Sequence, residues 1–306
     1  MKLVLATRGS ALALWQAESA ARALRLGRSD VEAELMIVKS GGDRDQTTDL
    51  ARFGRTGIFT VEVDEALLDR RAHVGVHSLK DVPTTLANGL ALAGVLPRGP
   101  AEDVLVSRGG ARLTELPPGA RIATGSVRRA AMLRRLRPDV EIVSIRGNVD
   151  TRLAKLDAGE ADAIVLARAG LERLGLAARI TQVLTREESV PAPSQGIVGL
   201  VCRADDRQTR AHLDRISDRE TAAEALAERA LLHALHGGCN APLGAHARAR
   251  ENALTLTARV LSLDGRECIE DRLGGAIDDA EALGRALAER LAAAGAKRLV
   301  DAARSR

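Results

Sequence analysis

Short apolar runs alternate with amphipathic stretches of helical length through residue 200 of this chain. This alternation predicts α/β layers, in which helices pack on a largely parallel sheet. We expect strands at 2–6, 33–38, 73–77, 103–107, 120–124, 140–145, 162–167 and 197–202. We expect helices at 11–25, 59–70, 127–136, 148–157 and 169–174. Proline and glycine predict a domain boundary near 96–102, and Pro191 with Pro193 closes a second unit.

The remaining residues follow another pattern. A helix that ends near His236 precedes three alternating segments, which predict strands at 244–249, 254–262 and 266–272, and a last helix covers 279–294. The apolar run 197–202 can return to the first domain and so form a two-segment hinge. The predicted fold class is two α/β domains joined by a hinge, plus a small α+β C-terminal domain with a three-stranded sheet. The predicted domains are 1–98 plus 197–215, 99–196 and 216–306.

Composition limits the function classes. Aromatic residues make up 1% of the chain, so it lacks the stacking platform that binders of single-stranded nucleic acid need. Of the 45 basic residues only five are lysines. This arginine bias is typical of GC-rich coding, and it also suits carboxylate recognition, because the guanidinium fork binds a carboxylate with two hydrogen bonds. The position of each arginine has to decide between these interpretations.

Compartment and metals are indicated mainly by what the sequence lacks. No run approaches the length of a membrane span, and the N-terminal segment lacks a signal-peptide pattern. The three cysteines are far apart and fit neither a disulfide framework nor zinc knuckles. We therefore expect a cytoplasmic protein without a metal site.

Polar segments follow four of the predicted strands. In LVLATRGSALA (3–13) and ARIATGSVRRAA (120–131), Ser10 and Ser126 stand where a helix N-cap belongs, next to Arg8, Arg128 and Arg129. SIRGNVDTRL (144–153) and VHSLKDVP (76–83) have the same placement. The side chains that these two segments add are Arg146, Arg152, His77, Ser78, Lys80 and Asp81. Because ligands of open α/β sheets bind beyond the carboxyl ends of the strands, the segments predict an anion-binding cleft.

Asp81 and Cys239 carry the most specific chemistry. The cations around Asp81 favour its ionised form, which suits stabilisation of a cationic intermediate, although a salt bridge to Lys80 or an arginine is as good an explanation. Cys239 follows two glycines, as an accessible nucleophile or attachment point would, although a buried loop cysteine is the commoner case. For Cys202 and Cys268 we expect buried thiols. The sequence has neither a hydrolase elbow nor a nucleotide-binding glycine motif.

Taken together, these segments closely resemble the porphobilinogen deaminase (hydroxymethylbilane synthase) family. The similarity extends in order over nearly the whole chain, through ATRGSALALWQA (6–17), GRTGIF (54–59), VHSLKDVP (76–83), TGSVRR (124–129), RGNVDTRL (146–153), DAIVLARAGLERLG (162–175), PAPSQG (191–196), CRADD (202–206) and GGCNAPLG (237–244). The resemblance implies three domains, of which the first two are like the halves of a type II periplasmic binding protein. It also implies a monomer that binds porphobilinogen, and neither nucleic acid nor a membrane.

The resemblance further implies an activity and a cofactor. The enzyme joins four porphobilinogen molecules head to tail with loss of ammonia, and the product is the linear tetrapyrrole hydroxymethylbilane. A dipyrromethane cofactor is attached to Cys239 through a thioether. Asp81 matches the catalytic carboxylate. Cofactor contacts match Lys80, Ser78, Thr124, Ser126, Arg128 and Arg129, and substrate contacts match Arg8, Ser10, Phe59, Arg146, Arg152 and Arg173.

Three departures and three rival functions remain. The family usually has Lys, Gln and Gly where this chain has Thr56, Asn240 and Ser194, and Thr56 falls in the loop 42–58, a candidate lid. The main rival is a solute-binding or ligand-sensing module on the same fold. A nucleic-acid binder using RRAAMLRRLR (128–137) and a deaminase fold without activity are weaker alternatives.

Overall fold

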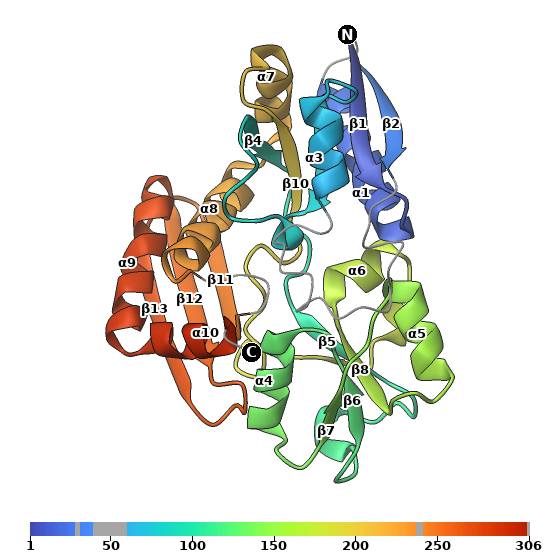
Figure 1. The fold of residues 1–306 in the computed structure, drawn as a ribbon, viewed down its shortest axis with the longest axis vertical. Helices are drawn as coiled ribbons and strands as arrows, with labels where there is room; N and C mark the ends of the chain where they lie inside the picture. The colour runs from blue at the N-terminus through green and yellow to red at the C-terminus, as the bar shows by residue number, and fades with distance from the viewer. Residues whose placement is uncertain (28–30, 39–59, 237–240, 305–306) are drawn as a thin grey trace. The chain divides into compact units, whose positions relative to one another are not determined.

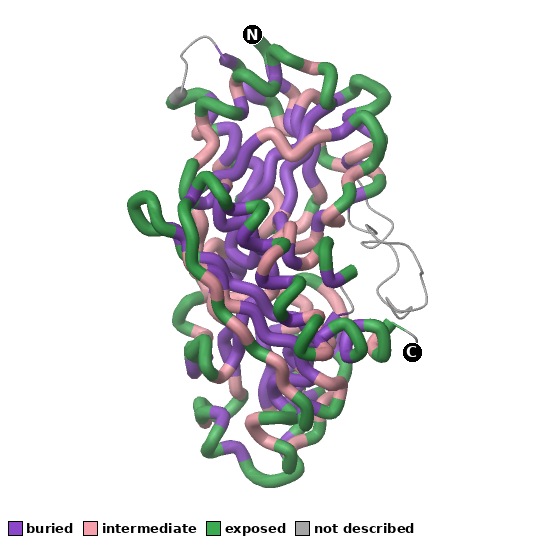
Figure 2. The backbone as a smooth tube through the Cα atoms, turned by 90° about the vertical axis from the view of Figure 1, so that its left-hand side faces the viewer, coloured by how far each residue is buried: buried purple, intermediate pink, exposed green. Residues whose placement is uncertain are grey.

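The structure is a computed structural model, and it describes residues 1–27, 31–38, 60–236 and 241–304. The contacts within the chain divide it into two units. The first unit contains residues 1–99 and 196–222, and the second contains residues 100–195 and 223–306. In both units the central strands are the most buried parts of the chain, for example 198–203 and 103–107. Figure 2 colours the backbone by burial.

The first unit has a five-stranded mixed sheet (Figure 1). Across the sheet its strands are β2 (Glu32–Val38), β1 (Lys2–Arg8), β3 (Val74–Ser78), β10 (Val198–Arg203) and β4 (Leu90–Val95). β1 is parallel to both of its neighbours, whereas β10 is antiparallel to both β3 and β4. The expected return of the chain at 197–202 therefore occurs, because β10 lies inside the first sheet.

Alternate residues of these strands face opposite layers of helices, as the period of a strand requires. Leu3 and Leu5 of β1 share a core with α1 (Ala11–Gly27) and α7 (Arg207–Ile216). Ala6 belongs to the core on the other face, which α3 (Val61–Leu68) covers. The central strands β3 and β10 are thus buried on both faces, which explains why they are nearly continuous apolar runs.

The second unit begins with another five-stranded mixed sheet, which has the same pattern of parallel and antiparallel neighbours. Its strands are β7 (Glu141–Val143), β6 (Arg121–Ala123), β8 (Ala163–Ala167), β5 (Asp103–Ser107) and β9 (Gln182–Val183). β6 is parallel to β7 and β8, and β5 is antiparallel to β8 and β9. α5 (Val149–Asp157) and α6 (Arg168–Arg173) share the core on one face, and α4 (Val127–Leu136) shares the core on the other.

The C-terminal part forms an antiparallel sheet of β11 (Leu243–Arg250), β12 (Ala253–Leu261) and β13 (Cys268–Ala276). α8 (Arg219–Ala234), α9 (Ala280–Ala293) and α10 (Ala296–Arg304) share a core with this sheet. A separate small cluster joins Leu261 and Cys268 to Met132 of α4 and to Val190. This contact explains why the second and third sheets belong to one contact unit.

The predicted fold class is confirmed, with two α/β sheets and a C-terminal three-stranded sheet. The sequence interpretation missed β4, α7, β9 and α10, and β13 runs to Ala276, beyond its predicted end. The α7 start has a cap that the sequence contains, since the Asp206 side chain accepts a hydrogen bond from the Thr209 N–H at 3.0 Å. The division into three domains stays a proposal.

Candidate active site

In the first unit, Arg8 and Ser10 lie where β1 meets α1. The Ser10 hydroxyl accepts a hydrogen bond from the Ala13 N–H at 3.3 Å, so the predicted helix cap is present. β3 is the parallel neighbour of β1, and therefore the carboxyl ends of both strands meet at one edge. Ser78 stands at the end of β3, and its Oγ accepts a hydrogen bond at 2.8 Å from Nε2 of Gln16, a buried residue of α1.

Lys80 and Asp81 follow directly, in a single 3-10 turn, η2 (Leu79–Asp81). Both residues are half-buried. Within the described ranges, the Asp81 carboxylate makes no hydrogen bond and no ion pair. The alternative interpretation of Asp81, as a salt-bridge partner, therefore finds no support in this part of the chain.

His77 lies beneath this edge and is buried, with 6% of its surface exposed. A Cβ on Gly75 would lie 2.9 Å from the His77 Nε2, so the imidazole fills the space that glycine leaves open. Nε2 is buried and has no hydrogen-bond partner within the residues that the structure describes. Burial, and then the charge of Arg8, lowers the pKa of His77 to about 4. The ring is therefore neutral at neutral pH.

In the second unit, Thr124 and Ser126 lie between β6 and α4. Thr124 Oγ1 accepts a hydrogen bond from the Ser126 N–H at 3.2 Å, and Ser126 Oγ accepts one from the Arg129 N–H at 3.4 Å. The second predicted helix cap is thus also present. α4 has its N-terminus at the carboxyl edge of the second sheet, where free N–H groups favour anions.

Three further predicted arginines belong to this unit. Arg146 follows β7, which is parallel to β6, so it extends from the same edge. Arg152 lies in α5, and its Nε donates a hydrogen bond to the Gly147 carbonyl at 2.8 Å. Arg173 ends α6, and burial lowers its pKa. All three side chains are half-buried.

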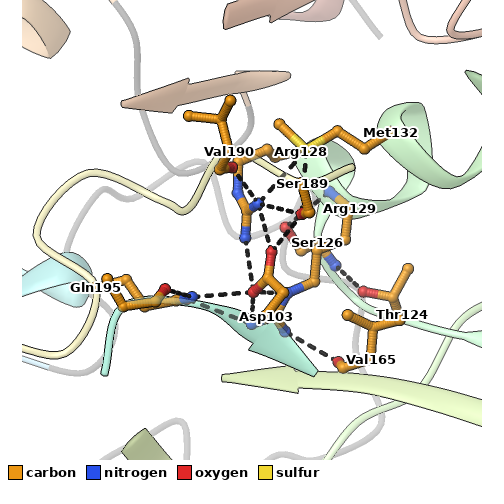
Figure 3. Close-up of polar contacts among 11 residues, drawn as sticks. Asp103, Thr124, Ser126, Arg128, Arg129, Met132, Val165, Ser189, Val190 and Gln195 are labelled. Carbon is orange, nitrogen blue, oxygen red and sulfur yellow. Dashed lines mark hydrogen bonds and ion pairs between the residues drawn. The ribbon is translucent and has the colours of Figure 1, made fainter. Parts of the chain in front are cut away.

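Arg128 and Arg129, the first arginines of α4, have only 4% and 6% of their surfaces exposed. Both bind Asp103, the first residue of β5, which is fully buried (Figure 3). Arg128 Nη1 lies 2.7 Å from Asp103 Oδ2, and Arg129 Nε lies 2.9 Å from Oδ1. Two more donors reach the same carboxylate, Ser189 Oγ at 2.7 Å and Gln195 Nε2 at 3.0 Å.

These contacts keep Asp103 ionised. Burial alone raises the pKa of Asp103, but the charges of Arg128 and Arg129, with hydrogen bonds from Arg128 and Gln195, outweigh it and hold the pKa well below its usual range. Each arginine also donates to a carbonyl oxygen, Arg128 to Val190 at 2.7 Å and Arg129 to Val165 at 3.0 Å. The two guanidinium groups are therefore fixed by the protein itself.

Comparison with known proteins identifies the family. Residues 3–211 match the family model described as porphobilinogen deaminase, dipyromethane cofactor binding domain. Residues 222–293 match the model described as porphobilinogen deaminase, C-terminal domain. This chain belongs to the porphobilinogen deaminase family. The resemblance inferred from the sequence motifs is confirmed.

Porphobilinogen deaminases of known sequence are similar along the whole chain. The protein from Syntrophotalea carbinolica is 44% identical over 300 residues, which are 98% of this chain and 95% of that protein. The protein from Pelobacter propionicus is 41% identical over 300 residues, 98% of this chain and 96% of that one.

Solved structures of two binding proteins align with TM-scores below 0.5. The methionine-binding protein MetQ has a TM-score of 0.46 at 13% identity, over 74% of this chain and 94% of that one. The periplasmic aliphatic sulphonate binding protein SsuA from Escherichia coli has a TM-score of 0.42 at 17% identity, over 77% and 70% of the two chains. In the described part of the chain, no helix has the length and apolar character to cross a membrane.

Several residues that the sequence analysis singled out lie outside the described residues. They are Cys239 and Phe59, with the departures Thr56 and Asn240 and the candidate lid 42–58. Of the other cysteines, Cys202 is buried as expected, and burial raises the pKa of its thiol to about 11. Cys268 is only half-buried, so the expectation of a buried thiol is wrong there: it starts β13 beside a pocket of about 210 Å³ that Arg135, Glu187 and Arg259 help to line.

Sequence reasoning missed three residues of the Asp103 cluster. Asp103 is the first residue of the predicted strand 103–107 and had no role assigned to it, and Ser189 had no pattern around it. Gln195 stands in PAPSQG (191–196), one of the segments that carry the resemblance, but no role followed from that segment. The one hint in the sequence was that Asp103 is the only charged residue of the predicted strand 103–107. Its pairing with Arg128 and Arg129 is visible only in the fold.

Proposed function

We propose that this chain catalyses the hydroxymethylbilane synthase reaction, in which four molecules of porphobilinogen are joined head to tail and, with one molecule of water, give hydroxymethylbilane and four molecules of ammonia. The observation that carries the proposal is the match to both family models over nearly the whole chain. A half-buried carboxylate without a partner among the described residues, Asp81, supports it further. A solute-binding module on the same fold explains neither the C-terminal family domain nor Asp81.

We propose that Cys239 carries the dipyrromethane cofactor. When bound, dipyrromethane supplies the pyrrole position to which the first substrate is joined. The described residues fit such a group, because a cationic cluster sits at the N-terminus of α4 and Arg128 Nε is buried with no acceptor in the described part of the chain. A buried N–H without an acceptor costs about 1–3 kcal/mol, which a bound carboxylate or water would recover. Lys80, Ser78, Thr124, Ser126, Arg128 and Arg129 are the proposed cofactor-binding residues.

Asp81 is the proposed catalytic residue. Loss of ammonia from the aminomethyl group of porphobilinogen leaves a cationic pyrrole, and an ionised carboxylate held close to it lowers the energy of the transition state. The Asp81 carboxylate is suited to this task because no described side chain competes for its lone pairs. The turn η2 places it directly after the anchored end of β3.

The remaining cations are proposed to bind the acetate and propionate groups of the substrate and of the growing chain. The proposed substrate-binding residues are Arg8, Ser10, Phe59, Arg146, Arg152 and Arg173. Arginine suits this role because its planar fork matches a carboxylate. We also propose three domains, as the resemblance implies, and a cytoplasmic monomer that uses neither nucleic acid nor a membrane as a partner.

Intact mass measurement tests the proposal. The purified protein is expected to be heavier than its sequence by one dipyrromethane, and peptide mapping should locate the adduct on Cys239. Cys239→Ser should lack both the adduct and the activity, whereas Cys268→Ser, a control that removes a half-buried thiol, should retain both. An active wild-type protein without an adduct, or an adduct on another cysteine, would contradict the assignment.

A further inference from the structure

The Asp103 carboxylate joins separate parts of the second unit (Figure 3). Two of its donors, Arg128 and Arg129, come from α4. The other two, Ser189 and Gln195, come from the segment between β9 and β10. Asp103 itself begins β5, so the acceptor sits on the sheet rather than on a loop. A carboxylate has about four acceptor sites, and these contacts use that capacity.

The bonds fix orientation as well as position. Arg128 contacts both carboxylate oxygens, through Nη1 at 2.7 Å and Nη2 at 3.2 Å. Arg129 also approaches through two nitrogens, Nε at 2.9 Å and Nη2 at 2.7 Å. A guanidinium group held by two of its nitrogens cannot rotate in its plane, so a single carboxylate determines how both arginines present their other N–H groups.

Charge makes the arrangement depend on Asp103. Two guanidinium groups that are more than nine-tenths buried would repel each other and would each lose hydration. The carboxylate between them offsets both effects. An amide in its place brings no charge, and its NH₂ group would face donors, so at least one arginine has to leave its present position.

We infer that Asp103 is a positioning residue for cofactor attachment, which holds Arg128 and Arg129 in the orientation that binds the carboxylates of dipyrromethane. This inference rests on the proposed function, because it assumes that the cofactor is attached to this chain. Asp103 acts through the arginines and does not contact the cofactor itself. The opposite arrangement is that Asp103 competes with the cofactor for the arginines, in which case its removal would speed attachment.

The test follows cofactor attachment rather than turnover. Full-length apo-protein, made in cells without porphobilinogen, is mixed with porphobilinogen, and the growth of the adduct is followed by intact mass. Asp103→Asn is expected to acquire the adduct about tenfold to a hundredfold more slowly than wild type per folded molecule, the loss that misplaced charge-assisted hydrogen bonds produce. Asp103→Glu keeps the charge but displaces the carboxylate, so its rate should lie between the two.

A matched control separates positioning from stability. Glu228 of α8 is another fully buried carboxylate of the same unit, and it accepts hydrogen bonds from the Ser194 N–H and, at 2.6 Å, from the Ala247 N–H. Glu228→Gln should unfold at a lower temperature yet acquire the adduct at the wild-type rate per folded molecule. Equal slowing in Glu228→Gln and Asp103→Asn would show a general structural effect and overturn the inference.

The other outcomes are equally decisive. Attachment by Asp103→Asn at or above the wild-type rate would favour competition over positioning. If Asp103→Asn cannot be recovered folded, Asp103→Glu takes its place, and attachment at the wild-type rate by that variant would refute the positioning role. Failure of wild type itself to acquire an adduct would instead contradict the proposed function, so the two failures are distinguishable.

Discussion

Asp81 in the first unit and Asp103 in the second both lie at the ends of strands, but their surroundings differ. Asp103 is fully buried and accepts hydrogen bonds from four side chains. Asp81 is half-buried and bonds to none of the described residues. A carboxylate whose lone pairs are all used can only hold its neighbours, whereas one with free lone pairs can meet a cation that forms during a reaction. An aspartate thus holds neighbouring side chains in place in the second unit, and we propose that an aspartate acts in catalysis in the first.

The largest expected effect comes from removing the partners of Asp103. Arg128→Ala combined with Arg129→Ala leaves a buried carboxylate without these two cations, and breaking a buried ion pair costs about 3–5 kcal/mol. Adding Asp103→Asn removes the stranded charge, so the triple variant should be more stable than the double variant and still lack the adduct. Urea unfolding and intact mass measure the two properties. A double variant as stable as wild type would show that the ion pairs do not support the fold.

The Asp81→Asn variant tests the catalytic role of the carboxylate in the first unit. Loss of a charge directed at a developing cation costs on the order of 3 kcal/mol, so kcat should fall about 100-fold or more. The unfolding midpoint should not change, because no described residue depends on this carboxylate. Steady-state kinetics on the loaded enzyme gives the answer, and a variant with near wild-type kcat would rule out the catalytic role.

A third test concerns the pH dependence of stability, for which His77, a buried group without a counter-charge, differs from Asp103, whose counter-charges are two arginines. The pKa of His77 is about 4 in the fold, below its ordinary value of 6.5, because of burial and then the charge of Arg8. The unfolded chain therefore binds a proton that the fold excludes. Above pH 6.5 this difference does not affect the free energy of unfolding. As the pH falls from 6.5 towards 4, protonation of His77 in the unfolded chain lowers the free energy of unfolding by up to about 3 kcal/mol.

The His77→Gln variant isolates this contribution, since glutamine does not titrate. Urea unfolding at pH 7 and at pH 4.5 should show a smaller loss of stability on acidification for the variant than for wild type. The same loss in both proteins would mean that other groups set the acid sensitivity. Asp103 behaves in the opposite way, because its two arginines keep it charged far into the acid range.

The extent of sequence prediction follows the range of the interactions. The helix caps at Ser10 and Ser126 are local, and both were predictable from a few neighbouring residues. The Asp103 cluster was not predictable, because Ser189 and Gln195 reach Asp103 only after the sheet has formed. β4 was missed because a short apolar run between turn residues has no distinctive period.

Backbone conformation was also beyond prediction, and it supplies the smallest expected effect. Ser194, where the resemblance implies glycine, has a φ of 64° and a buried hydroxyl without a partner among the described residues. Ser194→Gly relieves a left-handed conformation that costs about 1 kcal/mol or more, so the unfolding midpoint should rise. Ser194→Ala removes the hydroxyl but keeps the backbone strain and should gain less. An equal gain in both variants would assign the effect to the hydroxyl.

The position of β10 has a consequence for synthesis on the ribosome. β10 pairs with β3 and β4, but the ribosome makes it about 100 residues after β4, which takes roughly 5–20 s at ordinary rates of translation. During that interval β3 and β4 each have an open edge on the side where β10 belongs, and open edges are where nascent chains mispair. All strands of the second sheet are made before the first sheet can be completed. The first sheet therefore begins to form before the second sheet but is completed after it, and chaperones have most reason to bind the first sheet during this interval.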